Sequence, residues 1–237
     1  MNERIVVFLP TYNECENLLD LIEQLFALGL NLSVLVVDDQ SPDGTGELAD
    51  QLAAQYQGRV SVMHREGPRG RGWAGIDGLR EASQSECDYV VEMDADLSHL
   101  PGDLPVLLQA AQNADLVIGS RYVPGGKTEN FSWFRVLNSK VARWLSILFL
   151  GLNYTDPTSG YRVYRREALA QLPWDRMISP GPSIVEETLY YLQRNQARIA
   201  EAPIYYLERR EGRSKLNVWT RVRWIQTMLK IRQAANS

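Results

Sequence analysis

The feature that most constrains the fold is a regular alternation of two kinds of segment along the first half of the chain. Short runs of apolar and β-branched residues alternate with segments whose apolar residues recur at helical spacing. The apolar runs span residues 5–9, 33–37, 60–64, 89–93 and 116–119. Strands that are apolar throughout, each followed by a helix, are typical of a parallel sheet with both faces covered. The pattern predicts an α/β, Rossmann-like, mostly parallel central sheet, flanked by helices over 16–28, 45–56, 73–83 and 104–112.

The pattern changes after residue 122. We expect a long amphipathic helix over 131–152, a strand over 158–164, a helix over 183–194 and a strand over 199–207. The segment 214–237 contains basic residues and no acidic ones. Its apolar residues predict a basic amphipathic C-terminal helix, following one domain over 1–213. The predicted apolar stripe consists of Val218, Val222, Ile225 and Leu229.

Composition excludes several classes of protein. The 237 residues are 45% hydrophobic, which supports a substantial core, and the net charge of −4 implies no nucleic-acid partner. Cys15 and Cys87 are the two cysteines, so neither a disulfide framework nor a cysteine zinc site is expected. No apolar run reaches the roughly 18 residues that cross a bilayer, and the first residues do not resemble a signal peptide. We therefore expect a cytoplasmic protein that is soluble or peripheral on the membrane.

Polar side chains follow the predicted strands at the points where they end. Ligands of open parallel sheets bind beyond the carboxyl ends of the strands. The segments at these ends are PTYNE (10–14), DDQSPDGT (38–45), DAD (94–96) and GSRY (119–122). Because four such ends converge on one edge of the sheet, they predict a ligand site there.

Two acidic pairs in these segments are candidates for ligand binding. Asp94 and Asp96 offer carboxylates on a short tether, which suits Mg²⁺ or Mn²⁺, although an isolated D-x-D is more often a solvated turn. His99 alone is more typical of a hydrogen-bonded turn than of a metal ligand. Asp38 and Asp39 repel each other unless a partner uses them, and a nucleobase amide or a ribose hydroxyl is such a partner. The D-x-D pair therefore leaves metal binding and turn capping as alternatives.

A glycine motif follows the third predicted strand. GRGWAG (70–75) matches G-x-G-x-x-G, the dinucleotide fingerprint. That fingerprint belongs after the first strand, and Arg69 and Arg71 crowd this turn. We therefore favour close backbone approach to a ligand, or a flexible loop, over a nicotinamide site.

Together, the motifs of the chain resemble one family, the polyprenol-phosphate (dolichol-phosphate) mannose synthases of the family 2 glycosyltransferases. They occur in the family's order and extend to about residue 216. The motifs are PTYNE (10–14), VVDDQSPDGTG (36–46), MDADLSH (93–99), GSRYVPGG (119–126), SWFRVLNSKVA (132–142), DPTSGYR (156–162) and EAPIYYLERREGRSKL (201–216). One segment departs from the family's pattern, because GPSIVEE (181–187) keeps only Glu186.

The resemblance implies a glycosyltransferase A-type fold, with a nucleotide-sugar half over 1–122 and an acceptor half over 123–213. It also implies a divalent metal, Mg²⁺ or Mn²⁺, a GDP-mannose donor and a polyprenyl or dolichyl monophosphate acceptor. The residues implied for the nucleotide are Pro10, Tyr12, Glu14, Asp38 and Asp39. Those implied for the metal are Asp94, Asp96 and Ser98. The phosphate-facing residues are Arg121, Arg135, Ser139, Arg209 and Lys215, and the catalytic set is Asp96, Arg121, Arg135 and Arg209.

The implied reaction is an inverting displacement in which the metal neutralises the leaving diphosphate. A phosphate acceptor is already anionic, whereas a hydroxyl acceptor requires a carboxylate base, for which Asp156 and Glu186 are the candidates. The alternatives are a family 2 enzyme of cell-surface glycan synthesis, with a hydroxyl acceptor or a UDP-sugar donor, and a non-catalytic nucleotide-binding membrane adaptor. The intact D-x-D and 10–14 motifs count against the adaptor.

The basic C-terminal helix leaves two interpretations open. With Trp219 and Trp224 among lysines and arginines, it either lies in an anionic membrane interface or covers the sheet as an ordinary amphipathic helix.

Overall fold

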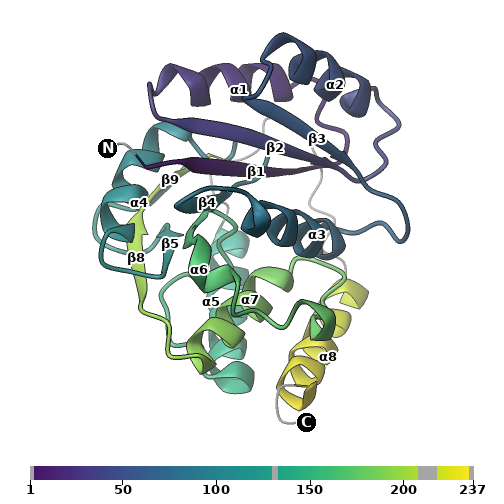
Figure 1. Ribbon diagram of the computed structural model, residues 1–237. Coiled ribbons are helices and arrows are strands. Elements are labelled where there is room, and N and C mark those ends of the chain that lie inside the picture. The colour runs from purple at the N-terminus through teal and green to yellow at the C-terminus, as the bar shows by residue number, and fades with distance from the viewer. Residues whose placement is uncertain (1–2, 130–132, 208–217, 235–237) are drawn as a thin grey trace.

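The computed structural model describes residues 3–129, 133–207 and 218–234. Its centre is a seven-stranded sheet in the order β3-β2-β1-β4-β7-β5-β8 (Figure 1). The strands are β1 (Ile5–Thr11), β2 (Leu32–Asp38), β3 (Val60–His64), β4 (Tyr89–Glu92), β5 (Leu116–Ser120), β7 (Arg162–Arg165) and β8 (Ile199–Pro203). All neighbouring strands run parallel except β7, which is antiparallel to both β4 and β5. A small parallel pair joins β6 (Lys127–Thr128) to β9 (Tyr205–Tyr206).

Helices cover both faces of this sheet (Figure 1). One face carries α1 (Leu18–Ala27), α2 (Thr45–Gln55) and α4 (Leu104–Ala111). The other carries α3 (Arg71–Gln84), α6 (Arg166–Leu169), α7 (Ile184–Arg194) and the ends of α5 (Trp133–Leu150) and α8 (Val218–Ala234). Two short 3₁₀ turns lie at η1 (Pro101–Asp103) and η2 (Trp174–Arg176). These layers confirm the predicted α/β fold, a mostly parallel central sheet flanked by helices.

The core explains why the strands are apolar throughout. In β1, Val7 and Leu9 pack in the cluster under α1, while Val6 and Phe8 pack in the cluster on the opposite face. Successive side chains of a strand point to opposite faces, so a strand covered on both sides needs apolar residues at every position. In the first half of the chain the predicted elements end within two residues of the observed ones.

Two strand predictions in the second half needed correction. The strand expected over 158–164 begins only at Arg162, because the residues before it form a hydrogen-bonded loop. The strand expected over 199–207 divides at Ile204, whose backbone N–H donates to the carbonyl oxygen of Ser120. Beyond that point the chain leaves the main sheet and pairs with β6 instead.

The glycine motif at the start of α3 serves packing. Gly72, Gly75 and Gly78 lie at helical spacing, and a Cβ built on Gly78 would overlap the ring of Phe8. A Cβ on Gly72 would overlap the backbone of Ser179. These glycines therefore allow close approach of other parts of the protein, and the predicted approach to a ligand stays a prediction. The alternative, a flexible loop, is wrong, because Arg71–Gln84 is helical.

The C-terminal helix α8 packs on the domain in the part that the structure describes. Trp224, Met228 and Ile231 join the core cluster on the α7 side of the sheet, and Met228 and Ile231 are fully buried. The predicted stripe is wrong at Leu229, which is 42% exposed. The packed face instead contains Trp224, whose indole N–H also donates to Glu186 Oε1 at 3.1 Å. Within the described residues, no helix is long and apolar enough to span a membrane.

Candidate active site

The site lies at the edge of the sheet where the parallel strands end. Since β7 runs the opposite way, the loop that enters it lies at the same edge as the loops that leave β4 and β5. A Cβ built on Gly160, in that loop, would lie 3.6 Å from both carboxylate oxygens of Asp94 and 3.6 Å from the ring of His99. The segments DADLSH and DPTSGYR, far apart in the sequence, therefore meet here.

Local hydrogen bonds shape the D-x-D turn. Asp96 Oδ1 accepts the backbone N–H of Ser98 at 3.0 Å and the Ser98 hydroxyl at 2.5 Å. Leu97, between them, has a φ of +58°, a conformation that few non-glycine residues adopt. Because Ser98 is buried, these two hydrogen bonds hold Asp96 Oδ1 from the interior of the protein. The turn presents two carboxylates in a fixed arrangement.

His99 has a positioning role that the sequence left open. Its ring is buried, stacks on Tyr161 at 5.1 Å between centroids, and meets the ring of Tyr206 edge-on at 5.3 Å. Burial lowers the pKa of His99 below its ordinary value, which favours a neutral ring. The backbone N–H of Asp94 donates to Nδ1 at 3.1 Å, so the acceptor nitrogen of that neutral ring holds the Asp94 backbone in place.

A buried chain of charges lies beneath Asp94. Arg71 Nη2 contacts Glu92 Oε1 at 2.8 Å and Asp94 Oδ1 at 3.3 Å. The Tyr164 hydroxyl donates to the other Glu92 oxygen at 2.9 Å, and Glu92 is fully buried. Sequence reasoning treated Arg71 only as an obstacle in the turn. The signal that it missed was Glu92, a charge inside an apolar strand that requires a buried partner.

The loops after β1 and β2 are tied to each other. The backbone N–H of Glu14 donates to Thr45 Oγ1 at 2.9 Å, that of Asn13 to Ser41 Oγ at 3.1 Å, and that of Cys15 to Asp43 Oδ2 at 3.2 Å. These bonds hold the segment after Pro10 against the start of α2. The Arg69 guanidinium covers the ring of Tyr12 at 5.1 Å and donates to its hydroxyl at 3.1 Å.

The adjacent acids after β2 have partners within the protein. Asp39 forms a buried ion pair with Arg65 and accepts the backbone N–H of Gly70 at 2.7 Å. Asp38 accepts the backbone N–H of Ser41 at 3.1 Å. Arg65 therefore offsets the repulsion between Asp38 and Asp39, for which a nucleotide partner was expected from the sequence.

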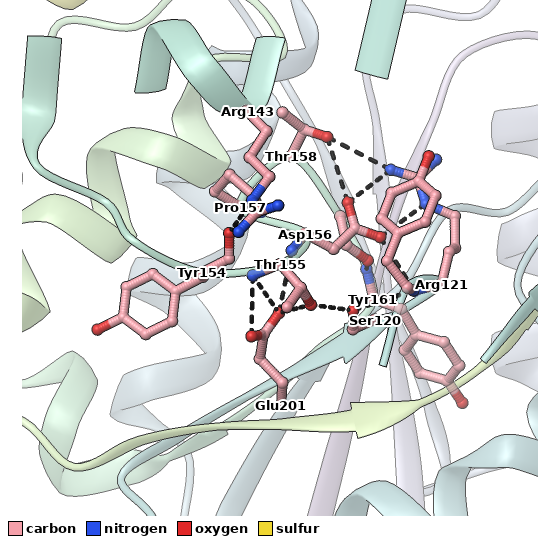
Figure 2. A network of polar contacts seen from close by, with 12 residues as sticks. Ser120, Arg121, Arg143, Tyr154, Thr155, Asp156, Pro157, Thr158, Tyr161 and Glu201 are labelled. Atoms are coloured by element: carbon pink, nitrogen blue, oxygen red, sulfur yellow. Dashed lines mark hydrogen bonds and ion pairs between the residues drawn. The ribbon is translucent and has the colours of Figure 1, made fainter. Parts of the chain in front are cut away.

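Arg121, directly after β5, forms a bidentate pair with Asp156 in the loop before β7 (Figure 2). Arg121 Nε donates to Asp156 Oδ2 and Nη2 donates to Oδ1, each at 2.7 Å. The backbone N–H groups of Thr155 and Asp156 both donate to Glu201, which fixes the Asp156 loop from below. The Arg121 guanidinium also lies 5.2 Å from the centroid of the Tyr206 ring. The pair holds the Arg121 guanidinium in one orientation, because its two parallel N–H donors match the two oxygens of the carboxylate.

Both candidate bases are engaged in structural contacts. Each carboxylate oxygen of Asp156 accepts from Arg121. Glu186 is buried and accepts the indole N–H of Trp224, and burial raises its pKa to about 7. Its neighbour Glu187 accepts the backbone N–H groups of Ile178 and Ser179, which anchors the segment that contacts α3.

The remaining predicted phosphate-facing residues are only partly placed. Ser139 lies half-buried on α5. Arg135 belongs to the same helix, but its side chain lies outside the described residues, as do Arg209 and Lys215.

The donor set fits a hard divalent cation that completes its shell with substrate. Within the ranges that the structure describes, no group of three or more histidine, cysteine or acidic residues could enclose a metal. Asp94 and Asp96 would supply two oxygen ligands, and Mg²⁺ or Mn²⁺ commonly takes its other ligands from phosphates and waters. Nδ1 of His99 is already used by the Asp94 backbone.

Comparison with known proteins identifies the family. The family model described as glycosyl transferase family 2 matches residues 6–172, and the chain belongs to this family. A polyprenol monophosphomannose synthase of Mycolicibacterium smegmatis is 42% identical over 91% of this chain and 82% of its own length. An undecaprenyl-phosphate mannosyltransferase of Micrococcus luteus is 44% identical over 90% and 88%. The predicted resemblance is confirmed, and the protein is a glycosyltransferase.

A solved structure confirms the predicted glycosyltransferase A-type fold. It is the glucosyl-3-phosphoglycerate synthase of Mycobacterium tuberculosis in complex with Mn²⁺, uridine diphosphate and phosphoglyceric acid. The two align with a TM-score of 0.69 at 22% identity, over 97% of this chain and 78% of the other.

The Arg121–Asp156 pair predicts a large stability effect for Asp156→Asn. The substitution removes the negative charge that binds a guanidinium only 11% exposed, so the free energy of unfolding should fall by about 3 kcal/mol. Asp115→Asn is the matched control, because Asp115 pairs with Arg198 in the same bidentate geometry but Arg198 is 62% exposed. That control should lose less than about 1 kcal/mol in urea denaturation. Equal losses in the two variants would contradict the assigned burial of the pair.

Proposed function

We propose that this glycosyltransferase moves mannose from GDP-mannose to a polyprenyl monophosphate, with inversion and with the help of a divalent metal. The supporting observation is the combination at one edge of the sheet of the D-x-D carboxylates and a fixed guanidinium, Arg121. The names of the two relatives, a polyprenol monophosphomannose synthase and an undecaprenyl-phosphate mannosyltransferase, support the same substrates.

In this proposal the donor half binds the nucleotide and the metal. Asp94 and Asp96 hold the metal on the donor diphosphate, and Ser98 acts by orienting Asp96. When bound, the metal supplies Lewis-acid stabilisation of the leaving diphosphate. The nucleotide lies against the loops after β1 and β2, whose residues include Pro10, Tyr12, Glu14, Asp38 and Asp39. The Mn²⁺ and uridine diphosphate bound by the structural neighbour support the use of a metal and a nucleotide by this chain.

The acceptor half favours a phosphate over a hydroxyl. A hydroxyl acceptor must lose a proton during attack, but Asp156 is paired with Arg121 and Glu186 with Trp224. A phosphate acceptor is anionic already and needs cations that align it. Among the residues that the structure describes, Arg121 is the proposed cation that aligns the acceptor phosphate. Arg135, Ser139, Arg209 and Lys215 complete the proposed set.

A peripheral membrane contact would bring the enzyme to its lipid acceptor, and α5 offers a surface for it. Its exposed apolar side chains recur at helical spacing and are 47–61% exposed. They are Leu137, Val141, Trp144 and Leu148. Helix α8 packs beside α5, and the two helices contain seven basic residues and no acidic one. An apolar stripe with a basic surround is the pattern of a helix lying on an anionic membrane. We propose that α5 makes this contact on the cytoplasmic face.

The donor and the metal are tested together by a panel of GDP-mannose, UDP-glucose and UDP-N-acetylglucosamine with a polyprenyl phosphate and Mn²⁺. Radiolabelled lipid product should form with GDP-mannose, and Asp96→Asn should lower the rate roughly 100-fold or more. Asp20→Asn, an exposed acid on α1, should have no effect. Full activity of Asp96→Asn would refute the metal assignment, and a preference for a UDP-sugar would refute the donor.

The membrane contact is tested by flotation with vesicles that contain anionic lipid. The double variant Trp144→Gln, Leu148→Gln removes two exposed apolar side chains from α5, so partitioning should weaken about tenfold. Val106→Gln is the control, since Val106 is 44% exposed on α4. A double variant that floats like the wild type would exclude α5 as the contact.

A further inference from the structure

Tyr206 lies where three segments of the candidate site meet. Its backbone forms an antiparallel bridge with His99, at the end of the D-x-D turn. It also pairs in register with Thr128 of β6, and its carbonyl oxygen accepts the N–H of Glu129 at 3.0 Å. The strand β6 follows the segment that begins at Arg121. The backbone of Tyr206 therefore joins the D-x-D turn to that segment.

The side chain of Tyr206 makes the same connection. Its half-buried ring meets the ring of His99 edge-on, with 5.3 Å between the centroids. The guanidinium carbon of Arg121 lies 5.2 Å from the centroid of the same tyrosine ring. Edge-on packing of two rings and a cation over an aromatic face are both favourable contacts. One side chain therefore contacts the residue that holds the Asp94 backbone and the cation proposed to align the acceptor phosphate.

The two neighbours of this ring are each fixed by other bonds. The ring of His99 is buried, and its Nδ1 accepts the backbone N–H of Asp94 at 3.1 Å. The guanidinium of Arg121 donates two hydrogen bonds of 2.7 Å to Asp156. A tyrosine ring is rigid and has only two side-chain torsions. The ring of Tyr206 therefore fixes how closely the guanidinium and the D-x-D turn approach each other.

This separation bears directly on the proposed reaction. The diphosphate leaves from the D-x-D turn, and the acceptor phosphate attacks from its position at Arg121. In a direct displacement the reacting atoms must lie about 3–3.5 Å apart, and an error of about 1 Å can cost about 100-fold in rate. The spacing of the two binding groups therefore controls the rate of transfer.

We propose that Tyr206 is a positioning residue that sets the separation between the D-x-D turn and Arg121. It acts on turnover of the complete complex and not on the binding of either substrate alone. This inference rests on the proposed transfer of mannose to a polyprenyl phosphate. It adds to that function the residue that aligns the two substrates with each other.

The test compares Tyr206→Leu with the wild type in transfer from GDP-mannose to a polyprenyl phosphate with Mn²⁺. Leucine keeps an apolar side chain at this position but removes both ring contacts. We expect kcat to fall about 30-fold or more, because the reacting groups lose their fixed separation. The KM of the polyprenyl phosphate and the calorimetric Kd of GDP with Mn²⁺ should each change by less than about twofold.

Three further variants separate the connection from other effects of the substitution. Tyr206→Phe keeps the ring and both contacts, so it should retain more than about half of the wild-type kcat. Tyr122→Leu removes a second ring, 5.3 Å from the Arg121 guanidinium, but leaves the contact with His99, and should lower kcat less than about threefold. Tyr205→Leu is the matched control and should match the wild type, because successive side chains of a strand point to opposite sides.

The contrary outcomes are distinct. An unchanged kcat in Tyr206→Leu, or a loss of GDP or acceptor binding as large as the loss of kcat, would overturn the proposal and leave the ring as a structural contact. A Tyr206→Phe variant as slow as Tyr206→Leu would overturn it too, since the hydroxyl would then carry the effect. So would an equal loss in Tyr122→Leu or Tyr205→Leu. A wild type that transfers no mannose to a polyprenyl phosphate would overturn the proposed function instead.

Discussion

The site depends on one topological constraint, the antiparallel strand β7 between β4 and β5. Glu92 of β4 pairs in register with Arg162 of β7, so the loop before β7 lies beside the D-x-D turn. Arg162 is fully buried and donates to the carbonyl oxygens of Pro157, Ser159 and Val185. Because Val185 belongs to α7, these bonds hold the loop against that helix. Because β7 runs opposite to β4 and β5, Asp156 in the loop before it shares an edge with Asp94 and with Arg121, which follows β5.

The charges at this edge are arranged before any ligand is bound. Three arginines, each paired with a carboxylate, hold the loops around the site: Arg65 with Asp39, Arg71 with Glu92 and Asp94, and Arg121 with Asp156. Buried ion pairs contribute little net stability, because desolvation offsets their attraction. Their value here is positional, since groups already oriented toward developing charge need no reorganisation during the reaction. We therefore propose that the pairs serve the function of the site more than the stability of the fold.

The sequence predicted the parallel part of the fold because its signal is local. A strand covered on both faces must be apolar at each position, and β1 shows this directly with Val6 and Val7 on opposite faces. The direction of β7 has no such signal, since the residues before Arg162 carry no periodicity that reveals orientation. The face of α8 was also predicted wrongly at Leu229, because the face that packs on the domain contains Trp224, Met228 and Ile231, and these tertiary contacts have no local signal.

The acidic residues of the candidate site could be predicted from the sequence, but the arginines that pair with acidic residues at this edge could not. Asp94 and Asp96 follow a predicted strand, so the sequence marks their edge. Arg65 and Arg71 lie 26 and 21 residues from the carboxylates they bind, and only the tertiary fold joins them. Residues of the family motif beyond the described ranges, Arg209 and Lys215, stay predictions.

The central claim is that the site aligns an anionic acceptor and does not deprotonate a neutral one. It is tested most directly by comparing a polyprenyl phosphate with the polyprenol of the same chain length, at equal concentration, with GDP-mannose and Mn²⁺. The account predicts mannosyl transfer to the phosphate and none above background to the alcohol. Transfer to the alcohol at a comparable rate would contradict it, because a base that the geometry does not offer would then be required.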